Sequence, residues 1–457
     1  MELFGTAGVR GPARTDVTPS LALRLGRAAA VDGAEFVIGR DGRETGAALA
    51  AAIESGLQSG GADAIRVGRV STPALAYASR GRRGIMVTAS HNPPADNGLK
   101  FFVDGTEYDR RAERDLESRV RSDSPPVPWN EWGDRAELAT IEAYRDAVSA
   151  YVADEAGTCE GVRVAVDCGN GTSGLTTPQV LRGLDARVAT LNANVDGHFP
   201  GRESKPTAES LADLRAFVDD GPFDLGIGHD GDGDRIVVVD ADGEVVHEDT
   251  VLAVIAERYT ETSDASDPVV VTTPNASGRI DERVEAAGGR VERVRLGGLH
   301  EGIAAANAEG TDDTAVAFAA EPWKHTHTRF GPWIDATVSA ALLTAMIADR
   351  GLPALLEPIT ERPYRKTNVE CPDEHKPAVM SRLESLLPDA FPEADAETEH
   401  GVRLTFPDGS WVLVRPSGTE PYVRIYAESN RVDDLTRAAT ETVEDALSDV
   451  SEGRGRA

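Results

Sequence analysis

Short runs of apolar residues alternate with amphipathic segments along most of the chain. Runs of apolar and β-branched residues predict buried strands, and they lie at residues 36–39, 64–67, 84–87, 162–167, 223–228, 236–239, 269–271, 291–296 and 315–318. Apolar residues spaced three or four positions apart predict helices at 49–57, 74–78, 141–152 and 334–348. This alternation of strand and helix is typical of doubly wound α/β units.

The pattern changes in the last quarter of the chain. Residues 402–406, 411–414 and 423–427 predict antiparallel strands joined by turns, and 432–447 a closing helix with one apolar face. We therefore predict an α/β fold of three similar doubly wound units followed by a C-terminal α+β domain with an antiparallel sheet. The predicted domains are 1–153, 154–254, 255–363 and 364–450. Two segments are predicted to lie outside the cores, a surface excursion at 119–132 and a frayed tail at 451–457.

The chain of 457 residues is strongly acidic, with 77 acidic and 47 basic side chains and a formal net charge of −30. Such a charge repels nucleic acid and anionic membranes, so we expect neither as a partner. It is also typical of a protein adapted to concentrated salt. The N-terminus has no signal-peptide pattern and no apolar run is long enough to span a membrane, so we expect a cytoplasmic protein.

The strand predicted at 84–87 ends in Thr-Ala-Ser-His-Asn-Pro-Pro. The two prolines prevent a regular element from continuing, so Ser90 is expected on a loop at a strand end, where α/β proteins place their chemistry. A serine hydroxyl is a weak nucleophile unless a neighbour activates it. His91 is adjacent and Lys100 follows beyond the turn. The alternative is an ordinary Asn-Pro turn with an incidental serine.

Asp230, Asp232 and Asp234 follow another predicted strand, with glycines between them. Three close carboxylates repel one another unless a cation neutralises them, and hard oxygen ligands suit Mg²⁺. A calcium EF-hand loop is excluded, because Arg235 stands where that loop needs glycine and Ala241 where it needs glutamate. Arg235 is suited to hold a phosphate oxygen. The alternative without a metal is a solvated acidic turn.

The segment Arg-Pro-Ser-Gly-Thr-Glu-Pro at 415–421 resembles a phosphate cradle. It combines guanidinium groups, hydroxyls and backbone N–H groups in one turn, and the candidate phosphate ligands are Arg415, Ser417, Gly418, Thr419 and Arg424. The alternative is an ordinary Ser-Gly turn between strands.

Arg40 and Arg43 directly follow the strand predicted at 36–39. Two interpretations remain open for this pair. The arginines either form ion pairs with Asp41 or Glu44, or they serve the site.

The three loops together closely resemble those of the α-D-phosphohexomutase family, in order and spacing, from Phe4 to about Glu428. The resemblance implies that Ser90 is a phosphoserine, which donates its phosphoryl group to a sugar monophosphate and recovers one from the resulting bisphosphate. It further implies Mg²⁺ bound by Ser90 and the three aspartates. Arg10, in the glycine-rich segment 4–11, and Lys100 would flank the phosphate, and Lys100 or His91 would handle the sugar hydroxyl proton. A hexose 1,6-bisphosphate is the implied activator.

The family's sugar-binding loop corresponds to the segment that begins at Glu321, and Lys324 lies in the same loop. Trp323 and Lys324 stand where the family has small residues, so Trp323 is expected either to pack the loop or to contact the sugar. Glucosamine, mannose and glucose phosphates all remain open, and phosphoglucosamine or phosphomannose is favoured. The expected partner is a small-molecule sugar phosphate, and the protein is expected to be a monomer or a homodimer. Two other functions remain open: a metal-dependent phosphatase or phosphotransferase, and a non-catalytic sugar-phosphate sensor.

Overall fold

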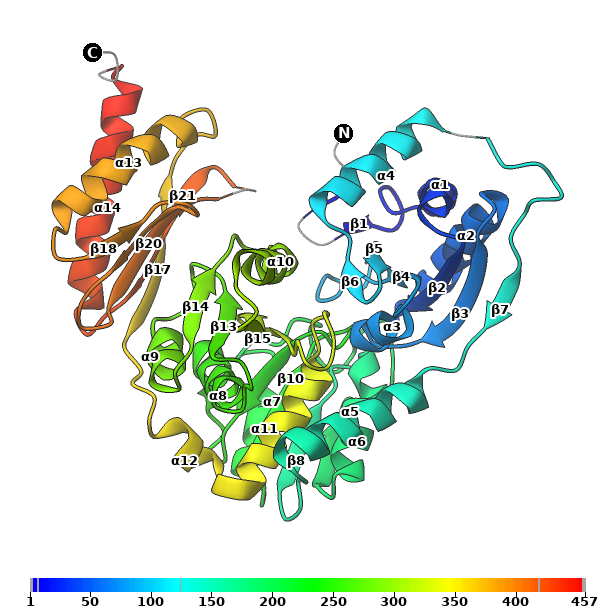
Figure 1. Ribbon diagram of the computed structural model, residues 1–457, viewed down its shortest axis with the longest axis horizontal. Helices are drawn as coiled ribbons and strands as arrows, with labels where there is room; N and C mark the ends of the chain where they lie inside the picture. Colours follow the sequence, from blue (N-terminus) through cyan, green and yellow to red (C-terminus); the bar gives the residue numbers. More distant parts are fainter. Residues whose placement is uncertain (1–2, 6–7, 124, 418–419, 454–457) are drawn as a thin grey trace. The chain divides into compact units, whose positions relative to one another are not determined.

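The structure is a computed structural model that describes residues 3–5, 8–123, 125–417 and 420–453. The chain divides into two compact units (Figure 1). One unit contains Met1–Val251 and Ala317–Leu356, and the other contains Leu252–Val316 and Glu357–Ala457.

The first unit begins with a mixed, seven-stranded sheet in which β4, β2, β3 and β7 run parallel, β5 pairs antiparallel with β4, and β1 pairs antiparallel with β5. Its strands are β1 (Val9–Pro12), β2 (Glu35–Arg40), β3 (Asp63–Arg69), β4 (Arg83–Val87), β5 (Asp96–Val103), β6 (Thr106–Glu107) and β7 (Arg135–Glu137). The helices in this part of the chain are α1 (Pro19–Ala29), the short η1 (Ala30–Asp32), α2 (Gly46–Ser59), α3 (Thr72–Ala78) and α4 (Arg110–Ser122).

Helix α4 corrects the sequence interpretation, because the segment predicted as an excursion from residue 119 begins with the last turn of this helix. The helix carries many charges. It has only two buried apolar residues, Leu116 and Val120, which lie four positions apart. That apolar stripe is too narrow to stand out in the sequence, and packing against the core supplies the remaining stability. Irregular chain begins at Asp123, which has a left-handed backbone conformation.

A second sheet follows in the first unit, in the order β12-β11-β10-β8-β9. Its strands are β8 (Arg163–Asp167), β9 (Arg187–Leu191), β10 (Leu225–His229), β11 (Ile236–Val239) and β12 (Val245–Val246). The helices along this segment are α5 (Ile141–Ala156), η2 (Thr172–Leu175), α6 (Thr177–Gly183), α7 (Ala212–Asp219) and α8 (Glu248–Glu261). The β-branched runs predicted at 162–167 and 236–239 are thus strands, and β10 and β11 pair antiparallel around the loop at 230–235.

Strands β13 to β16 make up the third sheet. In the first unit β16 (Lys324–Thr326) forms a hairpin with the end of β15 (Thr314–Glu321), in which Glu321 lies opposite Lys324. The long apolar segment predicted near residue 334 is α11 (Ala336–Arg350), and α12 (Leu352–Leu356) follows it. Asp335 caps α11 by accepting bonds from the N–H groups of Thr337 and Val338, at 3.1 and 3.0 Å.

The second unit contains the parallel pair β13 (Asp267–Thr272) and β14 (Arg290–Arg293), with α9 (Arg279–Ala286) and α10 (Leu299–Glu309). Strand β14 ends three residues before the predicted end at 296, and a turn bonded from Gly298 N to Arg295 O follows. The two glycines at 297 and 298 are typical of such a turn.

The rest of the second unit is an antiparallel, five-stranded sheet in the order β17-β21-β20-β19-β18, with α13 (Lys376–Ala390) and α14 (Val432–Ser451) on one face (Figure 1). Its strands are β17 (Tyr364–Glu370), β18 (Asp395–Glu397), β19 (Val402–Thr405), β20 (Trp411–Pro416) and β21 (Tyr422–Glu428). A continuous apolar core, including Val412, Ile425 and Val443, lies between sheet and helices.

Three α/β sheets followed by an antiparallel C-terminal sheet confirm the predicted fold class. Among the described residues, no helix combines the length and apolar character needed to cross a membrane. Ser451 belongs to the last turn of α14, and residues 454–457 of the predicted tail lie outside the described residues.

Candidate functional site

Ser90 lies on the loop that follows β4, and its side chain is buried. Its backbone is left-handed, with φ of 50°, a conformation that costs free energy for a residue other than glycine and is typical of functional loops. The Ser90 N–H donates to Thr88 Oγ1 at 2.9 Å. The loop is therefore held in a strained conformation by its own neighbours.

The Ser90 hydroxyl meets the aspartate loop. Ser90 Oγ donates to Asp230 Oδ2 at 2.8 Å and lies 3.3 Å from His91 Nδ1. Gly231 makes the approach possible, because a Cβ at this position would lie only 2.9 Å from the Ser90 carbonyl oxygen. Two predicted site segments, far apart in the sequence, are thus brought together.

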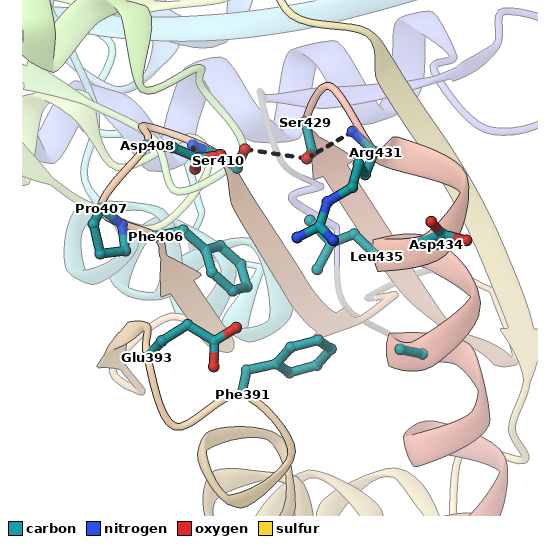
Figure 2. Close-up of a pocket in the computed structure, with 11 residues that line it drawn as sticks. Phe391, Glu393, Phe406, Pro407, Asp408, Ser410, Ser429, Arg431, Asp434 and Leu435 are labelled. Atoms are coloured by element: carbon teal, nitrogen blue, oxygen red, sulfur yellow. Dashed lines mark hydrogen bonds between the residues drawn. The ribbon is translucent and has the colours of Figure 1, made fainter.

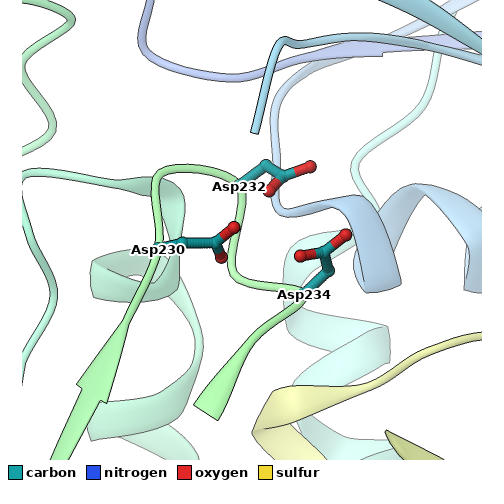
Figure 3. A group of neighbouring side chains, drawn as sticks. All are labelled: Asp230, Asp232 and Asp234. Atoms are coloured by element: carbon teal, nitrogen blue, oxygen red, sulfur yellow. The ribbon is translucent and has the colours of Figure 1, made fainter. Parts of the chain in front are cut away.

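The three aspartates surround one small space (Figure 3). Each offers a carboxylate oxygen, and these oxygens all lie within 4.8 Å of one another in the described part of the chain. Asp232 Oδ1 and Asp234 Oδ1 are buried, and no described residue forms a hydrogen bond with either atom. Buried, unpaired carboxylate oxygens are costly, and a hard divalent cation is the ligand that they fit. The triad is therefore consistent with a metal site.

The charges of the triad are unequal. Burial, together with the charges of Asp234 and Asp232, raises the pKa of Asp230 well above its usual range. Burial opposes ionisation of Asp234 as well, but Lys100 and Lys324 outweigh it and hold the pKa of Asp234 well below its usual range. Such divergence is the expected behaviour of close, buried carboxylates.

Lys100, on β5, is buried against the same carboxylates. Its Nζ lies 3.1 Å from Asp234 Oδ2 and 3.4 Å from Asp232 Oδ2. Burial favours the neutral amine, but the charges of Asp234 and Asp232 outweigh it and raise the pKa of Lys100. Lys100 therefore lies beside the aspartate loop.

His91 and Arg10 lie at the rim of this cluster. Burial, with the charges of Arg235 and Arg10, lowers the pKa of His91 to about 3, so the ring is neutral near pH 7. Arg10 is on β1, where it faces Gly98 of β5, and its buried Nε has no hydrogen-bond partner in the described part of the chain. A Cβ at Gly98 would meet the carbonyl oxygens of Thr88 and Val9 at 2.5 and 2.6 Å, so only glycine allows this packing.

Two further predicted cations reach the triad. Arg235 Nε lies 3.8 Å from Asp230 Oδ2, and Lys324 Nζ lies 3.7 Å from Asp234 Oδ2. Glu321 lies opposite Lys324 in the β15–β16 hairpin. The hairpin therefore brings the predicted sugar-binding segment beside the aspartate loop.

Trp323 forms the tip of this hairpin, with a left-handed φ of 69°. Its carbonyl accepts a bond from Ile236 N at 3.1 Å, and its indole packs partly buried against the core around β10. The ring centroid is 6.0 Å from both Lys205 Nζ and Arg235 Cζ, within reach of a cation–π interaction. Trp323 therefore packs against this core, which is one of the two roles expected for it from the sequence.

The predicted phosphate ligands lie in the second unit. Arg415 and Arg424 are directly paired across β20 and β21, and Ser417 is buried. The Nε atoms of both arginines and Ser417 Oγ are buried and have no hydrogen-bond partner among the residues that the structure describes. Two guanidinium groups that lie opposite each other repel one another, and an anion bound between them would relieve the repulsion and accept hydrogen bonds from their N–H groups. Gly418 and Thr419 lie outside the described residues.

Several bonds that shape the two sites were missed by sequence reasoning. Thr72 Oγ1, at the N-terminus of α3, donates to Asp232 Oδ2 at 2.6 Å. Lys376 Nζ donates to the carbonyl of Ser417 at 2.7 Å. Arg43 bonds to the Ser90 loop. Of these residues, only Arg43 could be singled out from the sequence, because it is one of two arginines that directly follow a predicted strand.

The second unit also has a cavity of about 410 Å³ (Figure 2). No residue predicted for the site is among those that line it. Its walls combine two aromatic rings with a short hydrogen-bonded chain from Ser410 through Ser429 to the Arg431 N–H. This cavity is therefore separate from the predicted phosphate ligands.

Comparison with known proteins gives three family-model matches. They are described as phosphoglucomutase/phosphomannomutase alpha/beta/alpha domain I over residues 1–126, alpha/beta/alpha domain II over 142–243, and the C-terminal domain over 367–445. A phosphopentomutase of Thermococcus kodakarensis is 41% identical over 454 residues, covering 97% of this chain and 98% of the relative. A probable phosphoglucosamine mutase of Methanopyrus kandleri is 41% identical over 442 residues, covering 93% of each chain.

Among solved structures, a phosphoglucomutase/phosphomannomutase family protein of Burkholderia thailandensis has the same fold. Its TM-score is 0.85 at 23% identity, with 97% of each chain covered. Together, the fold, the site and these matches define an intramolecular phosphotransferase, an enzyme of the isomerase class. The chain belongs to the phosphoglucomutase/phosphomannomutase family.

Proposed function

We propose that this sugar-phosphate mutase works through a phosphoserine at Ser90 and a sugar bisphosphate intermediate. The observation that carries the proposal is the 2.8 Å bond from Ser90 Oγ to Asp230 Oδ2, within a triad that has unpaired buried oxygens. A nucleophile beside a cation site is the arrangement that phosphoryl transfer requires.

In the proposed first step, the bond between Ser90 Oγ and phosphorus breaks as a sugar hydroxyl oxygen bonds to phosphorus. The hydroxyl proton passes to the neutral ring of His91, because Lys100 is held as an ammonium and cannot accept it. Ser90 Oγ takes up a proton as the phosphoryl group leaves, for which His91 Nδ1 lies 3.3 Å away, and the product is a sugar bisphosphate. The second step reverses these events at the other phosphate of the intermediate, which must turn over in the site. Arg10 and Arg235 hold the phosphate oxygens during transfer.

The residues proposed to hold Mg²⁺ are Asp230, Asp232 and Asp234, together with Ser90 through its phosphate. When bound, the ion neutralises charge on the transferring phosphoryl group. Hexose 1,6-bisphosphate is the proposed activator, because it phosphorylates Ser90 in a resting enzyme.

We propose that Arg415, Ser417 and Arg424, with Gly418 and Thr419, anchor the phosphate that is not being transferred. Support comes from the buried donors without partners on β20 and β21. A phosphatase needs no such second anchor, which favours the mutase over that alternative. Glu321 and Lys324 are the proposed contacts to the sugar, and the four predicted domains would each supply one of these loops.

The proposed substrates are the 6- and 1-phosphates of glucosamine or mannose. The probable phosphoglucosamine mutase of Methanopyrus kandleri supports the hexosamine. A pentose phosphate is the second candidate, because a phosphopentomutase matches this chain equally well, at 41% identity. These candidates differ in ring size and in the group at the second carbon.

A coupled assay with glucosamine, mannose, glucose and ribose 1-phosphates in parallel tests the proposal. We expect isomer formation that depends on Mg²⁺, and intact-mass spectrometry should find one phosphate on Ser90 in part of the protein. Phosphate release without isomer would show a phosphatase. Binding without turnover would show a sensor.

A further inference from the structure

Arg43 follows β2, and its side chain is completely buried in the first unit. Its Nε lies 3.1 Å from Asp41 Oδ2, so the ion pair considered from the sequence is present. A single ion pair uses only one N–H of a guanidinium that carries five. The acceptors of the other N–H groups therefore indicate what this residue does.

The two terminal nitrogens of Arg43 donate to four backbone carbonyls of the loop that carries Ser90. Nη2 donates to Ser90 O at 2.8 Å and to Asn92 O at 2.7 Å. Nη1 donates to Asp96 O at 2.9 Å and to Pro93 O at 2.5 Å. One planar guanidinium group thus donates hydrogen bonds to backbone carbonyls along the whole loop, which has no helix or sheet to supply them.

Asp41 extends this clamp to the other side of Ser90. Its carboxylate accepts from Arg43 Nε and from Thr88 Oγ1, the latter at 2.7 Å. Thr88 Oγ1 in turn accepts from the N–H of Ser90. The Asp41–Arg43 pair therefore holds the peptide groups on both sides of the Ser90 Cα.

This double attachment explains how Ser90 keeps its left-handed backbone. Such a conformation persists only where the surroundings over-determine it. The carbonyl of Ser90 also accepts from Ser204 Oγ at 2.9 Å, and the Phe199 ring centroid lies 5.1 Å from Arg43 Cζ. The loop is thus fixed at several points while Ser90 Oγ stays free to meet Asp230.

We propose that Arg43 is a positioning residue for phosphoryl transfer, which orders the Ser90 loop so that Oγ stays at bonding distance from Asp230 Oδ2. The proposal rests on the proposed function of Ser90. Arg43 acts through the loop carbonyls and not on the phosphoryl group itself. A lysine keeps the charge but cannot span four carbonyls, because its ammonium is a point donor.

The test compares Arg43→Lys with the wild-type protein, by hydrogen exchange of residues 88–97 and by steady-state kinetics. We expect amide exchange in the loop to rise at least about 10-fold. We expect kcat to fall about 100-fold while KM changes less than about 3-fold, because misplacing the reacting group affects the chemical step. Arg279→Lys is the matched control, since Arg279 is also buried but pairs with Glu361 and Glu428 in the second unit.

Thr88→Val is the second variant, which removes the link to the Ser90 N–H and leaves Arg43 in place. Thr88→Val should raise the rate of amide hydrogen exchange in the same loop and lower kcat less than Arg43→Lys does. If Arg43→Lys does not fold, Thr88→Val tests whether the clamp around Ser90 orders the loop. Wild-type exchange and kcat in the folded variants would overturn the proposal. Amide hydrogen exchange can be measured without turnover. If the wild-type protein has no mutase activity, the proposed function is refuted. The exchange of residues 88–97 still decides whether Arg43 orders the loop.

Discussion

Ser90 Oγ and Asp230 Oδ2 lie 2.8 Å apart, although 140 residues separate them along the chain. One belongs to the loop after β4 and the other to the loop after β10, so the contact joins two different sheets of the first unit. Had these groups been far apart, the proposed transfer would have had no site. The following predictions start from this contact.

Replacing Ser90 with alanine removes the atom that is proposed to carry the phosphoryl group. We expect mutase activity to fall at least about 1,000-fold, because another group cannot take over a covalent step. Mg²⁺ binding, measured by calorimetry, should persist because the triad is intact. Ser55→Ala is the control, since Ser55 is exposed on α2. A fully active Ser90→Ala protein would exclude the mechanism.

Asp232→Asn removes one negative charge of the triad and replaces one of the two carboxylate oxygens of this residue by an amide nitrogen. We expect the affinity for Mg²⁺ to fall about 100-fold or more, since charge and oxygen donors determine binding of this ion. Calorimetric titration measures the change, and chelation of the wild type should abolish activity reversibly. Asp242→Asn, in the exposed turn between β11 and β12, should retain wild-type affinity. Equal affinities would argue that the triad is an acidic turn only.

Thr72 donates to Asp232 Oδ2 and thereby orients this carboxylate. Thr72→Val loses the bond while keeping the shape of the side chain, so we expect the affinity for Mg²⁺ to fall about 10-fold. Thr72→Ser keeps the hydroxyl and should restore the affinity. If valine binds the ion as tightly as threonine does, the hydrogen bond has no part in the site.

Asp335 is fully buried and accepts four hydrogen bonds, from Tyr144 OH at 2.7 Å, Trp333 Nε1 at 2.9 Å and two backbone N–H groups of α11. Asp335→Asn would turn an amide N–H₂ toward one of these donors. We expect the free energy of unfolding to fall by about 2–4 kcal/mol, which a lower Tm reports. Asp349→Asn, at an exposed aspartate of α11, should leave the Tm unchanged. An unchanged Tm in Asp335→Asn would contradict this account of the cap.

The net charge of −30 leads to a prediction about salt. Screening weakens repulsion between exposed carboxylates, so the Tm should rise as KCl increases from about 0.2 M to about 2 M. Differential scanning calorimetry measures the trend. A Tm that stays constant or falls over this range would remove the charge-based argument for adaptation to concentrated salt.

The elements around the site were predictable because their signals are local. The apolar run at 84–87 is β4, and the runs at 411–414 and 423–427 lie within β20 and β21. Pro93 and Pro94 mark the loop after β4, and Pro416 ends β20. Helix α4 was missed because two apolar residues among many charges form no visible stripe.

The sequence by itself determined the fold class and the family resemblance, and it marked three loops as candidates for the site, because turn residues and hydrophobic periods depend on neighbours a few positions away. Only the tertiary structure decided which side chains meet: Ser90 with Asp230, Thr72 with Asp232, and Arg43 with four carbonyls of the Ser90 loop. These partners lie 47 to 160 residues apart. Over such separations a hydrogen bond is selected by the packing of whole sheets and helices, and no local pattern records it.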